Sequence, residues 1–186
     1  MAKVGLKNFR YSILTENEDG TPSFAGAKKL AKAIDCKVSI ESNNAELYAE
    51  DGLAESDYTF KKGTATIIID EDDDALMAEL LGHTIDEETG VMVRKDTDTA
   101  PFIGFGRIIT KLVGGKYKYK VEFLYKVKFK EPSQEDKTKG ENIEFQTPTL
   151  EGTVMKLGNG DWSETKTFDD QPAAVAFLEE LLAATV

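Results

Sequence analysis

The sequence predicts a mostly β protein with some helix, in which two packed antiparallel sheets form a sandwich or barrel with a flanking helix and a long projecting loop. Three observations favour this class. Residues 117–129 alternate apolar and mostly charged side chains, residues 64–69 form a β-branched run, and residues 171–185 have the apolar spacing of a helix. The length of 186 residues suits one domain that spans residues 1–186.

The first part of the chain is predicted to form three strands and one helix. Residues 8–15 and 36–40 alternate apolar and polar side chains, and the β-branched residues 64–69 form a third strand. Residues 28–34 are weakly helical but too short for a stable isolated helix. Residues 70–82 predict a short helix with acids at its N-terminal end, an apolar stripe and a terminating glycine.

A polar segment of 23 residues, 41–63, separates the second and third of these strands. Ordered loops of this length without secondary structure are uncommon, and this one carries apolar side chains that a disordered linker would lack. We therefore expect a projecting hairpin or arm that docks on another copy of the chain. Its expected apolar anchors are Leu47, Tyr48, Leu53 and Tyr58.

The most informative segment, residues 101–131, predicts a long β-hairpin. Gly114-Gly115 is a two-residue turn signal, and it aligns Glu122, the one glutamate of residues 111–130, with Arg107. The same register places Phe102 opposite Val127. Because favourable cross-strand pairs stabilise a register, this agreement supports the alignment.

The second face of this hairpin is also partly apolar. The register brings Phe105 opposite Leu124, the one apolar residue at an even position of the second strand. A half-apolar face of this length is poorly suited to water. We therefore expect Phe105 and Leu124 to contact another subunit.

The remaining segments are predicted from shorter patterns. Residues 91–94 form a short strand in an acidic loop, residues 132–142 a polar loop, and residues 143–157 a strand broken near Pro148 and Gly152. Residues 158–160 form a turn. The C-terminal helix, residues 171–185, has Pro172 in its first turn and places Val175, Leu178 and Leu182 on one face.

The net charge of −11 argues against a nucleic-acid groove or an anionic membrane surface as the main partner, because both need clustered cations. No apolar run is long enough to span a membrane, and the N-terminus lacks the pattern of a secretory signal. The chain nevertheless has an acidic first half and a lysine-rich strand. One interpretation is a solvated surface of both signs; the other is head-to-tail association, with Lys118, Lys120 and Lys126 meeting acids of a neighbour.

The sequence gives no sign of enzyme chemistry, and we expect no catalytic residues, cofactor or metal. The series Asp70, Asp72, Asp74 resembles the start of a calcium loop, but the required glycine and glutamate are replaced by Ala75 and Leu81. A glycosidase-type carboxylate pair stays open, because only spatial proximity defines it.

The single histidine and the single cysteine also favour structural roles. His83 follows a helix-ending glycine, where a histidine stabilises the helix dipole. Cys36 alternates with two apolar residues and is expected to be a small buried hydrophobe.

Several short sequence segments together indicate a resemblance to one protein family. They are KVGLKNFRYSILT, ELYAEDGLAE, AELLGH, APFIGFG and FLYKVKFKEP followed by KTKGENIEFQTPTLEGTV, and they extend over nearly the whole chain. The chain resembles the major tail tube proteins of long-tailed, non-contractile bacteriophages. Phage-derived, genome-free tail-like bacteriocins use related subunits.

The resemblance implies the phage tail tube fold and a structural role in the virion tail. Hexameric rings would assemble in the host bacterial cytoplasm and stack into a hollow tube. The tube would form around a tape-measure protein, join a terminator at one end and a baseplate-side protein at the other, and conduct genomic DNA to the host cell. The alternative from another class is a small soluble β-barrel that binds a ligand.

A tube that conducts DNA needs a channel wall that does not hold the polyanion. We therefore expect a net negative wall and no specific DNA-binding site. The candidate residues of this wall belong to residues 70–74 and 86–98, namely Asp72, Asp73, Asp86, Glu87 and Glu88.

Overall fold

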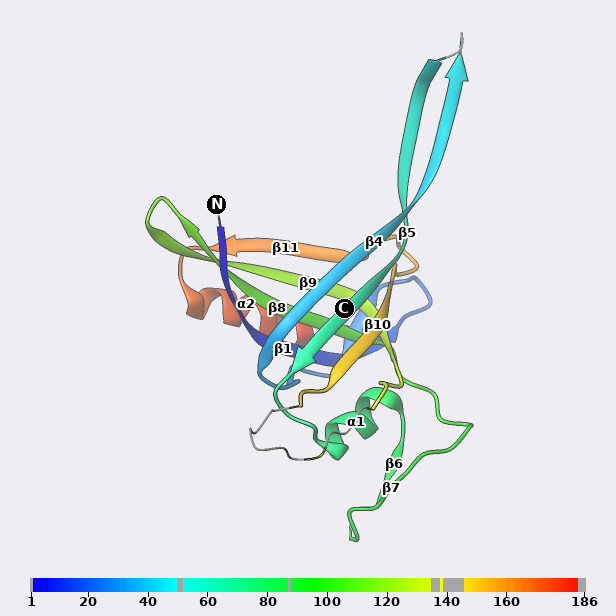
Figure 1. Cartoon of the computed structure of the whole chain (residues 1–186), viewed down its shortest axis with the longest axis vertical. Coiled ribbons are helices and arrows are strands. Elements are labelled where there is room, and N and C mark those ends of the chain that lie inside the picture. The colour runs from blue at the N-terminus through cyan, green and yellow to red at the C-terminus, as the bar shows by residue number, and fades with distance from the viewer. Residues whose placement is uncertain (1, 50–51, 87, 135–137, 139–145, 184–186) are drawn as a thin grey trace.

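The computed structural model describes residues 2–49, 52–86, 88–134, 138 and 146–183, and it shows a mostly β chain with two helices (Figure 1). This confirms the predicted class and the flanking C-terminal helix. The elements in chain order are β1 (Ala2–Glu16), β2 (Pro22–Phe24), β3 (Lys28–Lys29), β4 (Ala33–Ala49), β5 (Gly52–Ile69), α1 (Asp74–Leu81), β6 (Thr84–Ile85), β7 (Met92–Val93), β8 (Ile103–Val113), β9 (Lys116–Lys130), β10 (Thr149–Met155), β11 (Ser163–Phe168) and α2 (Gln171–Ala183).

Within the described residues, nine strands form one antiparallel sheet in the order β2-β1-β8-β9-β10-β5-β4, with β3 added to β1 and β11 added to β9. The long strand β9 pairs with β11 over its first half and with β10 over its second half. The sheet folds over at this split, so that β10, β5 and β4 cross in front of β1, β8 and β9 (Figure 1). The two packed layers therefore belong to one continuous sheet, where we had predicted two. A second, two-stranded sheet pairs β6 with β7.

The space between the two layers holds the larger hydrophobic core. Phe9 of β1, Ile67 of β5 and Leu150 of β10 are fully buried there. Phe105 joins them with 1% exposure, its ring centroid 5.3 Å from that of Phe9, and Leu124 is 2% exposed. The expectation that Phe105 and Leu124 contact another subunit is therefore wrong, because the folded-over layer of the same chain covers them.

Helix α2 covers the opposite face of the long hairpin. Leu178 and Leu182 pack there with Ile108 and Phe123 in a second buried cluster. Gly106 makes the close approach possible, since a Cβ on it would lie 2.2 Å from Leu178 Cδ1. Both faces of the hairpin are thus buried within the chain away from its tip, where Leu112 and Tyr117 are exposed.

The predicted register of the hairpin is confirmed from the turn at residues 114–115 to Phe105. It fails beyond that point, because Ile103 and not Phe102 pairs with Val127. Two residues of β9, at 125 and 126, face the single residue Gly104, which is a β-bulge. The extra residue moves the later odd positions of β9, including Val127, into the core between the layers.

Two other segments differ from the prediction. Residues 28–34 form no helix; Lys28 and Lys29 pair with β1, and β4 begins at Ala33. Strand β11 was not predicted, because its sequence, SETKTF, has little apolar alternation. It forms because the edge of β9 supplies backbone partners, a tertiary cause that local sequence does not carry.

Both helices have the predicted caps or apolar faces. The Asp73 side chain accepts the Ala75 N–H at the start of α1, and Gly82 ends this helix with φ of 78°. Helix α2 begins with the Ala173 N–H donated to the Asp170 carboxylate at 3.0 Å. Its buried face contains Ala174, Leu178 and Leu182, while Val175, which we had predicted on this face, is only partly buried.

Candidate functional site

The most unusual feature of the fold is the arm, defined as residues 41–63 of the β4–β5 hairpin. Its strands pair from Glu41 with Lys62 out to Ala49 with Gly52. Pairing of β5 with β10 ends where Val154 meets Gly63. From there the hairpin extends away from the body at one end of the molecule (Figure 1). The predicted projecting hairpin is confirmed.

The expected anchors all lie on this arm. Tyr58 is 64% exposed, so its ring is accessible for contact with another molecule. Leu47, Tyr48 and Leu53 lie on the arm strands, but their side chains fall outside the described part of the structure. Contact of these four residues with another copy stays a prediction.

A second feature lies at the opposite end of the long axis, where α1 and the β6–β7 ribbon are found (Figure 1). Four of the five acids expected in a channel wall are described, and all belong to this region. Asp72 and Asp73 precede α1, and Asp86 and Glu88 lie in the turn of the ribbon. Glu87 lies outside the described residues. The fold brings the two acidic segments to one end of the molecule (Figure 1).

Several of these carboxylates have local structural partners. Asp86 accepts the backbone N–H groups of Glu88 and Thr89, both at 2.9 Å, which lowers the pKa of its carboxyl. Asp70 accepts the backbone N–H and the Nζ of Lys32. Among the described residues, no group of three or more histidine, cysteine or acidic side chains is arranged to hold a metal ion.

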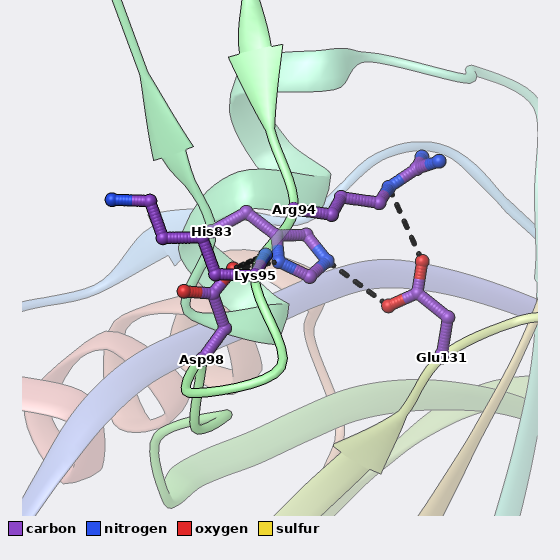
Figure 2. Close-up of polar contacts among 5 residues, drawn as sticks. All are labelled: His83, Arg94, Lys95, Asp98 and Glu131. Atoms are coloured by element: carbon purple, nitrogen blue, oxygen red, sulfur yellow. Dashed lines mark hydrogen bonds and ion pairs between the residues drawn. The ribbon is translucent and has the colours of Figure 1, made fainter.

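His83 holds the base of the ribbon against the end of β9 (Figure 2). Its Nδ1 lies 2.8 Å from an Asp98 oxygen, and its Nε2 lies 3.0 Å from a Glu131 oxygen. Arg94 Nε lies 3.3 Å from the other Glu131 oxygen, and the Lys95 N–H donates to Asp98 at 2.8 Å. We call these five residues the His83 clasp.

The clasp favours the charged form of the imidazole. The hydrogen bond to Asp98 is the main cause that raises the pKa of His83; burial opposes it and Glu131 adds to it. The ring is only 7% exposed, and each of its nitrogens faces a carboxylate. A histidine held in this way acts as an ion-pair partner. We had expected His83 to stabilise the helix end, and that role stays a prediction. Its contacts with Asp98 and Glu131 join positions 15 and 48 residues away, which the local sequence did not reveal.

The lysine row of β9 has partners within the chain. Lys118 lies 2.6 Å from Asp169, and Lys120 lies 3.8 Å from Glu122. Lys126 pairs with Glu16, lies over the Phe102 ring and is 18% exposed. Lys126 thus already has an acidic partner in its own chain, and its contact with a neighbour stays a prediction. Lys118 and Lys120 are more exposed, but they also have acids of their own chain.

Cys36 of β4 contacts the guanidinium of Arg107. Its Sγ and its carbonyl oxygen both contact Arg107 Nη1. Burial raises the pKa of the thiol to about 11, and the nearby arginine only partly opposes this. The thiol is therefore protonated at neutral pH and poorly nucleophilic.

One aromatic contact at the base of the arm escaped the sequence reasoning. Phe60 of β5 stacks on Trp162, with ring centroids 4.8 Å apart and planes at 11°. The two residues are about a hundred positions apart, and nothing in their local sequences links them.

No family model matches the chain, and no curated protein is significantly similar to it. Neither helix in the described part of the chain has the length and hydropathy that a membrane crossing needs.

Proposed function

We propose that this protein is a structural subunit that assembles with copies of itself as hexameric rings, which stack into the hollow tail tube of a bacteriophage. The tube conducts genomic DNA from the capsid to the host cell. The subunit catalyses no reaction. The same subunit would serve a genome-free, tail-like bacteriocin.

The observation that carries this proposal is the arm. On the arm side of Gly63, β5 no longer pairs with β10. Strands β4 and β5 continue there as an isolated two-stranded hairpin of about ten residues in each strand. An isolated two-stranded hairpin is marginally stable in water, because it buries too little apolar surface. A partner that covers the arm stabilises it. In a stacked assembly, a second copy of the chain supplies such a partner surface at every ring.

The distribution of charge supports the same proposal. The acids at residues 70–74 and 86–98 gather at the end opposite the arm, while most described lysines of β9 are paired within the chain. We place these acids on or near the channel wall, where like charge keeps DNA from binding. DNA then passes through the tube without a specific site.

The proposed partners follow from this role. They are further copies of the chain, a tape-measure protein within the tube, a terminator at one end and a baseplate-side protein at the other. Assembly takes place in the bacterial cytoplasm, and the finished protein resides in the virion tail. The sequence resemblance supports these partners.

The ligand-binding barrel is less favoured by the packing. Large side chains, among them Phe9, Ile67 and Phe105, fill the space between the two layers and are at most 1% exposed. A barrel that binds a ligand in its interior needs that space empty.

Negative-stain electron microscopy of the purified protein over a range of concentrations tests the proposal directly. We expect rings or tubes of uniform diameter, with size-exclusion chromatography showing growth of large species as the concentration rises. A protein that stays monomeric at the highest soluble concentration, with and without a purified tape-measure segment, would contradict the tail-tube role.

A further inference from the structure

The arm leaves the body at a defined place, the line along which the sheet folds over. At this line β9 exchanges one partner strand for another: β11 pairs up to Leu124, and β10 pairs from Lys126. The chain between β10 and β11, residues 156–162, fills the gap between the two partners and ends with Trp162. Trp162 therefore lies where the two layers part and where β5 separates from β10.

The connection that carries Trp162 is held from several sides. Leu157 is 1% exposed, and its N–H donates to the Asp161 carbonyl at 2.7 Å. The Tyr125 N–H donates to the carbonyl of Trp162 itself at 3.2 Å. The Glu16 carboxylate accepts the Gly158 N–H and also pairs with Lys126. These contacts fix the connection that carries Trp162 to β1 and β9, and the indole packs against the core between the layers.

The arm bends at the same level. Glu41 pairs with Lys62 while Ser42 pairs with Phe60, so Lys61 is an extra residue in β5. Such a bulge bends a strand and increases its twist. Gly63 permits the tight crossing beside it, since a Cβ there would lie 2.9 Å from Ile40 Cδ1 and 3.1 Å from Val154 Cβ. Because the bulge interrupts the ladder hydrogen bonds, the ladder alone holds the arm less firmly at this point.

The Phe60–Trp162 stack supplies the missing restraint. Phe60 lies immediately beyond the bulge on the arm side, and its ring lies flat on the indole at 4.8 Å. Parallel contact between two broad rings tolerates little rotation of one strand against the other. We propose that Trp162 is a positioning residue that sets the angle of the arm by stacking on Phe60. Its effect on tube formation rests on the proposed function; its effect on the arm angle does not.

The single tryptophan allows the Phe60–Trp162 stack, which we call the brace, to be tested in the isolated protein. The variants are Phe60→Leu and Trp162→Leu, which keep an apolar side chain but remove the stack, and Trp162→Phe, which keeps an aromatic ring. In Phe60→Leu, we expect the tryptophan emission to shift to the red and acrylamide quenching to increase. Paired spin labels at Ser56→Cys and Lys166→Cys, in a Cys36→Ala background, then report the distance from arm to body. We expect a narrow distribution with the stack intact, a broad one in both leucine variants and a narrow one again in Trp162→Phe.

Assembly is measured in the same proteins without labels. If the loss of the stack leaves about a tenth of the arms at the competent angle, the protein concentration needed for tube formation rises about tenfold. Phe168→Leu is the matched control, because it disrupts an aromatic pair with Phe177, at 5.3 Å, between β11 and α2. It should leave assembly unchanged.

The outcomes separate the two proposals. If wild-type protein never forms tubes but the leucine variants broaden the distance distribution, the tail-tube role is wrong and the brace stands. An unchanged distribution in folded Phe60→Leu protein would overturn the brace. Normal assembly of both leucine variants would overturn its effect on tube formation. If Trp162→Leu does not fold, Phe60→Leu decides alone, since Phe60 lies outside the two buried clusters.

Discussion

Arg107 of β8 lies directly opposite Glu122 of β9, and its Nε donates to the Glu122 carboxylate at 2.9 Å. The two side chains are 8% and 21% exposed, so this ion pair is largely removed from water. Burial alone would raise the pKa of Glu122, but the Arg107 charge outweighs it and the pKa is lowered. The pair links the long hairpin to Cys36 of β4 through the same guanidinium.

Replacing Arg107 by methionine should lower the free energy of unfolding by about 3 kcal/mol, because it leaves a buried carboxylate without its main partner. We place the loss at the low end of the usual range, since Lys120 also lies 3.8 Å from Glu122. Urea unfolding measures it. The double variant Arg107→Met/Glu122→Leu should recover most of the loss. Asp169→Asn, which removes an exposed pair with Lys118, should cause no measurable change; an equal loss there would contradict the role of burial.

Gly104→Ala should destabilise the protein by about 1–3 kcal/mol, because the added methyl overpacks the core beneath α2. A Cβ there would lie 2.5 Å from the Phe24 ring and 2.8 Å from the Phe123 ring. Thermal unfolding monitored by circular dichroism measures the change. Gly5→Ala is the control, since its nearest neighbour, Thr110 Cβ, lies at 3.6 Å. Comparable losses at the two positions would show that close packing at Gly104 is not the cause.

The His83 clasp predicts a pH dependence whose sign follows from its charged state. The pKa of His83 is raised in the folded chain, so its stabilising contribution is complete below the unfolded value of about 6.5. That contribution is lost as the pH rises through the folded pKa. The difference in unfolding free energy between wild type and His83→Gln should therefore shrink from pH 6 to pH 9. Because the chain has one histidine, the imidazole proton resonances titrate without ambiguity. A midpoint at or below about 6.5 would refute the clasp.

Asp98 predicts a loss of stability at the acid end of the pH range. Its pKa is lowered, first by the Lys95 N–H and then by His83, so its contribution is present above the unfolded value of about 3.9. It is lost as the pH falls through the folded pKa. In Asp98→Asn, the pKa of His83 should fall relative to wild type. The shift of the same imidazole resonances measures it, and an unmoved midpoint would mean that Glu131 alone holds the ring.

Shortening the arm should abolish assembly without unfolding the subunit. Ala45 pairs with Asp57, so replacing residues 46–56 by Asn-Gly closes the ribbon with a two-residue turn. We expect little change in the melting temperature and no tubes in electron micrographs. The control replaces Gly114-Gly115 at the tip of the β8–β9 hairpin by the same dipeptide and should still assemble. Tubes of normal length from the shortened protein would show that the arm is not a stacking element.

Local chemistry made the secondary structure of this chain largely predictable. The alternation along β9 and the glycine pair at its turn predicted a hairpin and its register as far as Phe105, because cross-strand partners must match in polarity and charge. The acids, apolar stripe and glycine of α1 predicted that helix and its end. The polar segment 41–63, which forms the outer parts of β4 and β5, was long enough to predict an arm.

What covers each face depended on contacts between distant segments, which local sequence does not encode. Phe105 and Leu124 had the pattern of an exposed apolar face, yet the layer of β5 and β10 buries them. The bulge opposite Gly104 moved the later residues of β9 to the opposite face of the sheet. Because β9 pairs first with β11 and then with β10, the strands form one folded sheet where two were predicted.

The sequence by itself determined most of the long strands, the two helices, the charge balance and the existence of the arm, because hydrophobic periodicity, turn residues and helix caps act over a few neighbouring positions. Only the tertiary structure decided that His83 meets Asp98 and Glu131 and that Phe60 stacks on Trp162. Both arrangements join residues that the fold of the sheet brings together, and their energies arise from burial and geometry that exist only once the layers have packed.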